Sequence, residues 1–279
     1  MAEAGRLHVV AVPIGNLEDI TLRALRVLRE ASLVACEDTR RTGQLLELLG
    51  LPGRPLLAVH DHNERARSAR IVEVLESGGQ VALVSDAGTP TISDPGYSLV
   101  RAVVEAGYAV VTVPGPCAVV AALAGAGLPT DRFRFLGFPP AKVEARRRFF
   151  EALTGAQETL VFYVAPHDLV EVLQSAHDTM GGGRPAVIAR ELTKRFEEFH
   201  RGTLADLVAD PGVVRGEVVL LIGGAPEEAL PDADTLHAAA RAIQQEGFTG
   251  ARAARELARR TGVDRDEAYR VVLALRGER

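Results

Sequence analysis

A regular alternation of short apolar segments and helical segments is the feature that most restricts how this sequence can fold. Five apolar, β-branched runs in the first 115 residues end at intervals of 24, 23, 25 and 29 residues. Their last residues are Val12, Cys36, Val59, Val84 and Val113. Amphipathic segments of helical period, such as LRALRVLREA and RIVEVLESGG, lie between the runs. Apolar strands joined by helical crossovers of this length predict a mostly parallel sheet that is covered on both faces.

A second α/β region is predicted over residues 116–225. The strand-like segments FRFLGF, TLVFYV and PAVIAR alternate with the helical segments KVEARRRFFEAL and DLVEVLQSAHDTM, and EEFHRGTLADL and EVVLLI add two short strands with a helical turn between them. Because the tight strand–helix repeat is lost here, we expect a mixed sheet. We therefore expect two α/β domains, residues 1–115 and 116–225.

Residues 226–279 form a different kind of segment. A Pro- and acid-rich linker, GGAPEEALPDAD, leads into three predicted helices, with Asp264 as an N-cap after Gly262. This helical tail is either a small bundle that packs on the body or on a partner subunit, or a helix pair that contacts nucleic acid.

The charge balance argues against a protein with a cationic surface all round. Thirty-two Lys and Arg residues against 37 Asp and Glu residues give a formal net charge of −5, unlike a generic nucleic-acid binder. Thirty of the cations are arginines, which either codon bias or bidentate contacts to phosphate would explain.

The sequence predicts a cytoplasmic protein with no membrane contact. Its start lacks a basic region followed by a long apolar stretch, and no uncharged apolar run reaches the roughly 18 residues of a membrane span. Cys36 and Cys117 stand in no metal or redox spacing, which fits a reducing compartment.

Five unusual polar segments follow the predicted strands of the first region: PIGN, EDTR, HDHNE, SDAGTP and PGP. Ligands of open α/β sheets bind at the carboxyl ends of the strands, so these segments predict a cleft. Neither GxGxxG nor GxxxxGK[ST] occurs, so the sequence does not support a dinucleotide site or a P-loop phosphate site.

Each segment also has a plain structural interpretation. SDAGTP either binds the ribose hydroxyls and amino-acid group of a ligand or forms an ordinary turn. His60, at a strand end, either acts as a general base or substrate contact or is structural. The HxH pattern of HDHNE is a weak metal signal, because the other histidines supply no further ligands with suitable spacing, and we expect no metal.

Acidic and basic residues stand next to each other in EDTRR. Glu37 either faces the cleft, with Arg40 or Arg41 steering an anionic substrate, or precedes a helix that Asp38 or Thr39 simply caps.

Seven segments together carry a resemblance to a known family: VAVPIGNLEDIT, ACEDTRRT, HDHNE, VSDAGTPTISDPG, VPGPCA, VFYVAPHDL and RELTKRFEEF. They resemble the bacterial small-subunit ribosomal RNA cytidine 2′-O-methyltransferases, a branch of the tetrapyrrole (precorrin/corrin) methylase superfamily. The resemblance extends from about Leu7 to Gly224. It implies S-adenosylmethionine as methyl donor, a donor-binding cleft between two α/β domains, and a homodimer acting on the small ribosomal subunit or its rRNA.

The same resemblance assigns residues to the donor site. The donor-binding positions it implies are Pro13, Ser85, Asp86, Thr89, Gly115, Cys117, Ala118, Val164 and Leu192. The segment VSDAG stands where other superfamily members carry GGDP, which argues against a tetrapyrrole substrate.

Transfer to a ribose 2′-hydroxyl needs in-line geometry and a group that takes the hydroxyl proton. Our candidates for that group are Glu37 and His60, with Asn63 and Glu64 positioning the nucleotide and Arg40 and Arg41 contacting the RNA. An acidic protein needs a local cationic face for RNA, which we expect from a set of arginines: Arg40, Arg41, Arg146–Arg148, Arg252, Arg255, Arg259 and Arg260. Two other hypotheses about the function stay open: a small-molecule (tetrapyrrole-type) methyltransferase and a non-enzymatic ribosome-binding factor.

Overall fold

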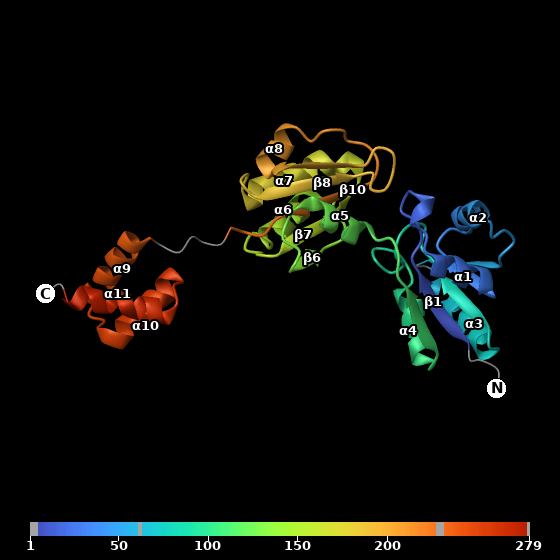
Figure 1. The fold of residues 1–279 in the computed structure, drawn as a ribbon, viewed down its shortest axis with the longest axis horizontal. Coiled ribbons are helices and arrows are strands. Elements are labelled where there is room, and N and C mark those ends of the chain that lie inside the picture. Colours follow the sequence, from blue (N-terminus) through green and yellow to red (C-terminus); the bar gives the residue numbers. More distant parts are fainter. Residues whose placement is uncertain (1–4, 61–62, 227–231, 278–279) are drawn as a thin grey trace. The chain divides into compact units, whose positions relative to one another are not determined.

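A parallel five-stranded sheet forms the first part of the chain in the computed structural model, which describes residues 5–60, 63–226 and 232–277 (Figure 1). The strands are β1 (Arg6–Val10), β2 (Leu33–Cys36), β3 (Leu56–Ala58), β4 (Gln80–Leu83) and β5 (Ala109–Val113), in the order β3-β2-β4-β1-β5. All neighbouring strands run parallel, so the expected sheet type is confirmed. β1 ends before Val12, because Val12 leaves the sheet and pairs with Gly88 in an isolated bridge.

Helices cover both faces of this sheet. The helices α1 (Leu22–Glu30) and α2 (Thr39–Leu48) pack on one face, and α3 (Glu64–Glu76) and α4 (Tyr97–Glu105) pack on the other. Side chains alternate along a strand, so Val34 and Cys36 join the first core while Ala35 joins the second. A short 3-10 turn, η1 (Leu17–Asp19), precedes α1.

A mixed five-stranded sheet follows, as expected. Its strands are β6 (Phe133–Phe135), β7 (Thr159–Val164), β8 (Pro185–Arg190), β9 (Glu198–Thr203) and β10 (Val218–Ile222), in the order β6-β7-β10-β8-β9. Only β6 and β7 run parallel, and the other pairs are antiparallel. The helices α6 (Val143–Glu151), α7 (Leu169–Met180) and α8 (Leu204–Ala209) pack on one face, and the turn η2 (Pro166–Asp168) leads into α7.

The other face of the mixed sheet is covered by α5 (Ala118–Ala126), a helix that the sequence pattern did not predict. Its sequence AVVAALAGA is apolar or small throughout, so no amphipathic period marks it. It packs on residues of β7, β8 and β10, such as Val161, Val187 and Val219.

The chain forms two compact units, Met1–Ala225 and Pro226–Arg279. The second unit contains the three expected helices, α9 (Ala233–Gln245), α10 (Gly250–Thr261) and α11 (Arg265–Gly277), around an apolar core of its own. The predicted cap is confirmed, since Asp264 Oδ1 accepts from the backbone N–H groups of Asp266 and Glu267 at 2.8 and 2.9 Å. Within the described ranges, no helix has both the length and the apolar character that a bilayer crossing requires.

Candidate active site

The loops that follow β1, β4 and β5 are tied to one another by backbone hydrogen bonds and by one side-chain hydroxyl. Val12 and Gly88 exchange two N–H···O bonds of 2.9 and 3.0 Å, and the Thr89 hydroxyl donates to the carbonyl of Pro116 at 3.0 Å. Gly88 has φ of +76°, and a Cβ there would approach Ile14 Cγ2 to 3.2 Å, so a glycine suits this crossing. These bonds hold three strand-end loops in one arrangement.

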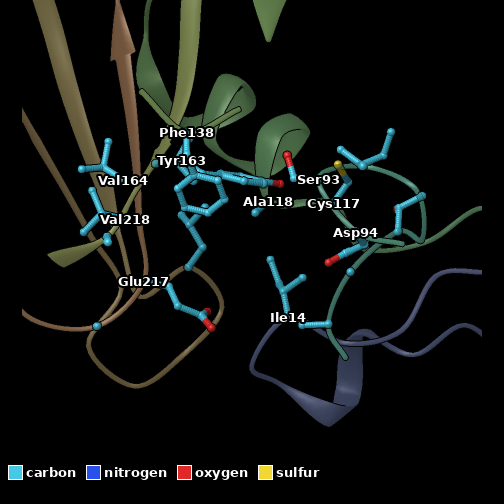
Figure 2. Close-up of a pocket in the computed structure, with 18 of the residues that line it drawn as sticks. Ile14, Ser93, Asp94, Cys117, Ala118, Phe138, Tyr163, Val164, Glu217 and Val218 are labelled. Carbon is cyan, nitrogen blue, oxygen red and sulfur yellow. The ribbon is translucent and has the colours of Figure 1, made fainter. Parts of the chain in front are cut away.

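A cavity of about 360 Å³ lies beside these loops, a size typical of small-molecule sites. One wall comes from the loops after β1, β4 and β5 and from the start of α5, and the other comes from the second sheet (Figure 2). Because β10 runs antiparallel to β7, the residues before β10 meet those after β7 at one edge of that sheet. The lining residues are Ile14, Ala87, Gly88, Thr89, Ile92, Ser93, Asp94, Cys117, Ala118, Phe138, Tyr163, Val164, Ala165, Pro166, Leu192, Gly216, Glu217, Val218 and Val219.

The structure brings five of the expected donor positions together around this cavity. They come from four separate segments of the chain: Thr89, Cys117, Ala118, Val164 and Leu192. No single stretch of sequence contains the site, so only the packing of the two sheets assembles it.

The other four expected positions are not among the residues that line the cavity, and three of them have contacts of their own. Ser85 is 3% exposed and its hydroxyl donates to the carbonyl of Ala87 at 3.0 Å. The Asp86 carboxylate accepts from Arg41 Nη1 at 3.0 Å, and a Cβ at Gly115 would lie 3.1 Å from the Ala11 Cβ. Pro13, the fourth, is buried. These contacts hold the loops whose neighbouring residues face the cavity.

Several lining residues were not singled out from the sequence: Ser93, Asp94, Phe138, Tyr163 and Glu217. Asp94 belongs to the segment VSDAGTPTISDPG, so the length of that motif was the available signal. The loop is strained, because Thr91 and Ser93 have φ of 72° and 61°, conformations that cost on the order of 1–3 kcal/mol each and cluster at functional sites. Phe138 lies against Tyr163, with ring centroids 5.6 Å apart.

The pKa values of two groups in the cavity are shifted. The pKa of the Asp94 carboxyl is raised to about 6, mainly by burial and also by the negative charges of Glu37 and Asp86, while the Ser85 hydroxyl opposes the shift. Burial also raises the pKa of Tyr163 to about 12, so this phenol stays protonated at neutral pH.

The Glu217 carboxylate, which also lines the cavity, is ion-paired. Its Oε2 accepts from Lys194 Nζ at 3.0 Å, and the same ammonium group contacts Glu191 Oε1 at 2.9 Å.

The described residues of the loop after β3 do not line the cavity. His60 Nε2 lies 2.9 Å from the side-chain nitrogen of Asn63, and the Asn63 oxygen accepts from the backbone N–H of His60 at 3.0 Å. Neither His60 nor Glu37 lines the cavity, although Glu37 is close enough to affect the pKa of Asp94. Asp61 and His62 of HDHNE lie outside the described residues.

Glu64 is engaged in the interior. It is 6% exposed, and its Oε1 accepts from the backbone N–H of Leu99 at 2.8 Å. That N–H belongs to the first turn of α4, whose N-cap is Gly96 with no side chain to offer. Glu64 of α3 therefore supplies the capping acceptor that α4 lacks, in place of the nucleotide contact we expected.

The capping interpretation of EDTRR is confirmed. Asp38 Oδ1 accepts from the backbone N–H groups of Arg40 and Arg41, and these bonds hold the pKa of the Asp38 carboxyl below its usual range. The Arg40 side chain is 89% exposed and lies 3.7 Å from Asp38, and the Arg41 side chain is 71% exposed and pairs with Asp86 at 3.0 Å.

The expectation of an RNA-facing arginine cluster in α6 is wrong for Arg146. That residue is 2% exposed, and its guanidinium donates to Ser175, to the carbonyl of Ala141 and to Glu171 Oε2 at 2.7 Å. A buried arginine whose donors are paired in this way joins α6 to α7 and has no access to a phosphate.

In the second unit, the basic residues of α10 differ in their surroundings. Arg259 and Arg260 form ion pairs with Glu256, and Arg260 also pairs with Glu246. Among the described residues, no carboxylate pairs with Arg252 or Arg255, and both are exposed.

The described part of the chain holds no group of three or more His, Cys, Asp or Glu residues that could bind a metal ion.

In the unit Met1–Ala225, two α/β sheets share a ligand-sized cavity at their strand ends, an arrangement typical of small-molecule sites. The model for the family Tetrapyrrole (Corrin/Porphyrin) Methylases matches residues 6–208. The chain is 53% identical over 230 residues to Ribosomal RNA small subunit methyltransferase I of Pseudomonas aeruginosa, covering 80% of this chain and 81% of the relative. It is 45% identical over 279 residues to the protein of the same name from Escherichia coli O157:H7, covering 98% and 96%.

A solved structure shares the fold. Uroporphyrin-III C-methyl transferase from Thermus thermophilus, complexed with S-adenyl homocysteine, matches with a TM-score of 0.53 and 20% identity, covering 78% of this chain and 96% of that one. The chain belongs to the tetrapyrrole methylase family and, within it, to the family of the ribosomal RNA small subunit methyltransferase I proteins. It is a methyltransferase.

Proposed function

We propose that this chain transfers the methyl group of S-adenosylmethionine to the ribose 2′-hydroxyl of a cytidine in small-subunit ribosomal RNA. The observation that carries this proposal is the 45% identity to a ribosomal RNA small subunit methyltransferase I over 98% of the chain. The solved relatives with tetrapyrrole substrates share less than 25% identity, so they support the fold and not a tetrapyrrole substrate.

The donor occupies the cavity between the two sheets in this proposal. Apolar groups such as Ala118, Val164 and Leu192 pack against the uncharged parts of the donor, and Thr89 and Cys117 lie on the wall formed by the strand-end loops. Pro13, Ser85, Asp86 and Gly115 belong to the same strand-end loops. A mainly apolar cavity with few polar groups suits a ligand whose orientation must be fixed.

The reaction is an in-line displacement at the methyl carbon. The ribose oxygen forms the new O–CH₃ bond while the S–CH₃ bond breaks, the sulfonium becomes a neutral thioether, and the hydroxyl proton leaves. Because the donor is already activated, placing the oxygen and the methyl carbon about 3 Å apart in line supplies much of the acceleration.

RNA contacts come from exposed arginines, of which Arg40 is the most accessible near the cavity loops, with Arg252 and Arg255 in the helical unit. Asn63 remains a nucleotide contact in this proposal. Phosphate contacts of this kind make affinity fall steeply with rising salt. The protein acts in the cytoplasm as a homodimer.

A three-substrate transfer assay tests the proposal. The purified protein is incubated with donor carrying a labelled methyl group and with small ribosomal subunits, bare small-subunit rRNA or a tetrapyrrole. We expect label in RNA, on a cytidine ribose, from at least one of the first two. Transfer to the tetrapyrrole alone would favour the small-molecule alternative, and no transfer to any of them would leave only a binding function.

A further inference from the structure

Methyl transfer to a hydroxyl needs a proton acceptor, and the cavity contains few groups that could serve. A base must reach the proton that it removes, so it has to be sought among the residues that line the cavity. The titratable ones are Asp94, Cys117, Tyr163 and Glu217.

Three of these four groups are poorly suited to the task. Tyr163 keeps its proton at neutral pH because its pKa is raised to about 12. The Glu217 side chain is 73% exposed and is neutralised by Lys194 at 3.0 Å. A Cys117 thiolate beside a sulfonium would itself compete for the methyl group, because thiolates are strong nucleophiles.

Asp94 differs from them in position and surroundings. Its carboxylate points into the cavity from the loop after β4 (Figure 2), and among the described residues no cation pairs with it. Two residues of that loop, Thr91 and Ser93, hold left-handed backbone conformations that a relaxed turn would avoid. The strain is consistent with a loop shaped to present this side chain.

We propose that the Asp94 carboxylate is the catalytic base that accepts the ribose 2′-hydroxyl proton, an inference that rests on the proposed function. As the oxygen attacks, its proton passes to Asp94, the O–CH₃ bond forms, and the donor leaves as a neutral thioether. The protonated carboxyl then loses its proton to water.

The surroundings of Asp94 tune it for this role. A base works best when its pKa lies near the working pH, and burial together with Glu37 raises the pKa of Asp94 to about 6. Glu37 is thereby a positioning residue that acts through Asp94. The charged and titratable groups around Asp94 are Glu37, Asp86 with its partner Arg41, Tyr163, Cys117, and Glu217 with its partner Lys194.

The test compares Asp94→Asn with the wild type in single-turnover transfer to small ribosomal subunits, with donor affinity measured separately. Asp94→Asn should lower the transfer rate by about 10²–10⁴-fold, while donor Kd changes by less than about tenfold. Asp94→Glu should restore part of the rate, because it retains a carboxylate.

The pH profile gives a readout that a structural role would not move. For the wild type, kcat/KM for the donor should fall about tenfold per unit below pH 6, since the base must be unprotonated. Glu37→Gln should move this acid limb to lower pH, because it removes a neighbouring negative charge. Glu217→Gln, which removes a carboxylate from the opposite wall, is the matched control and should leave the position of the limb unchanged.

Three results would overturn the inference. Wild-type turnover in Asp94→Asn would exclude it as the base, and a loss of donor affinity equal to the loss of rate would make it a donor ligand. Removal of the acid limb by His60→Ala alone would transfer the role to the loop after β3. If the wild type transfers no label to any RNA, the proposed function fails as well, and that outcome is separate because it appears before any variant is compared.

Discussion

Two loops of the same sheet, SDAGTPTISDPG after β4 and HDHNE after β3, look equally suited to a site in the sequence. Both follow an apolar strand, and both contain carboxylates and turn-forming residues. In the structure the loop after β4 lines the cavity, and the described residues of the loop after β3 do not. The described residues of the loop after β3 instead make local hydrogen bonds and cap α4.

Strand order explains the difference. In the order β3-β2-β4-β1-β5, the strands β4, β1 and β5, whose loops line the cavity, are neighbours, whereas β2 lies between β3 and this group. The loop after β4 can therefore pair with the loop after β1, as Val12 and Gly88 do, and reach the second sheet. A polar segment at a strand end is thus a necessary condition for a site in such a sheet, and the position of its strand decides whether the condition suffices.

The largest effect on donor binding should come from a substitution that blocks the cavity beside the loop after β4. Ala118→Trp puts a large ring at the start of α5, where it lines the cavity. Because the ring takes up space that the donor needs, donor affinity should fall by about 100-fold, which is about 2.8 kcal/mol, as measured by calorimetric titration. Val120→Trp is the control, because Val120 lies on the same helix, is 59% exposed and is outside the lining. Equal affinity losses in both variants would argue against this cavity as the donor site.

Mutation of Glu64, the last residue of HDHNE, should change the stability of the protein and not its activity. Glu64→Ala leaves the buried N–H of Leu99 without its acceptor, which should lower the free energy of unfolding by about 2 kcal/mol. Turnover per folded molecule should stay at the wild-type level. Glu76→Ala, an exposed carboxylate on the same helix, should change stability by less than about 0.5 kcal/mol. A fall in turnover of fully folded Glu64→Ala would return this residue to the substrate site.

The smallest expected effect is a gain in stability when Asp94 is replaced. The pKa of this carboxyl is raised from 3.8 to about 6 on folding, so the folded state binds more protons than the unfolded state between those values. The contribution of Asp94 to wild-type stability should therefore decrease as the pH rises from about 4 to 6. Asp94→Asn removes this dependence, and it should be more stable than the wild type by on the order of 1 kcal/mol at pH 7 once partial exposure is allowed for.

Urea unfolding at pH 4 and pH 7 measures this effect. The two proteins should differ less at pH 4, where the carboxyl is protonated in both states. A stability difference that does not change with pH would mean that folding does not raise the pKa of Asp94. The loop after β4 would then not differ from the loop after β3 in holding a destabilised carboxylate.

Local patterns were enough to predict most of the elements. The parallel sheet, the mixed sheet and the three terminal helices follow from hydrophobic period, and the caps at Asp38 and Asp264 follow from residue type. The helix α5 was missed because a helix that is apolar on all sides carries no period.

Burial of charged residues was the main error. Arg146 and Glu64 looked like surface charges, yet each is used inside the protein to satisfy groups on a neighbouring helix. Nothing in the neighbouring sequence announces such a partner, because Glu171 and Leu99 are 25 and 35 residues away.

The sequence by itself determined the two kinds of sheet, the helical unit at the end and the motifs that carry the family resemblance, because these depend on local period and residue type. Only the tertiary structure decided which loops face the cavity. It placed Asp94 in the cavity lining and buried Glu64 in the interior. The physical reason is that strand order, the packing of α5 on the second sheet and the burial of charges depend on contacts between residues far apart in the chain.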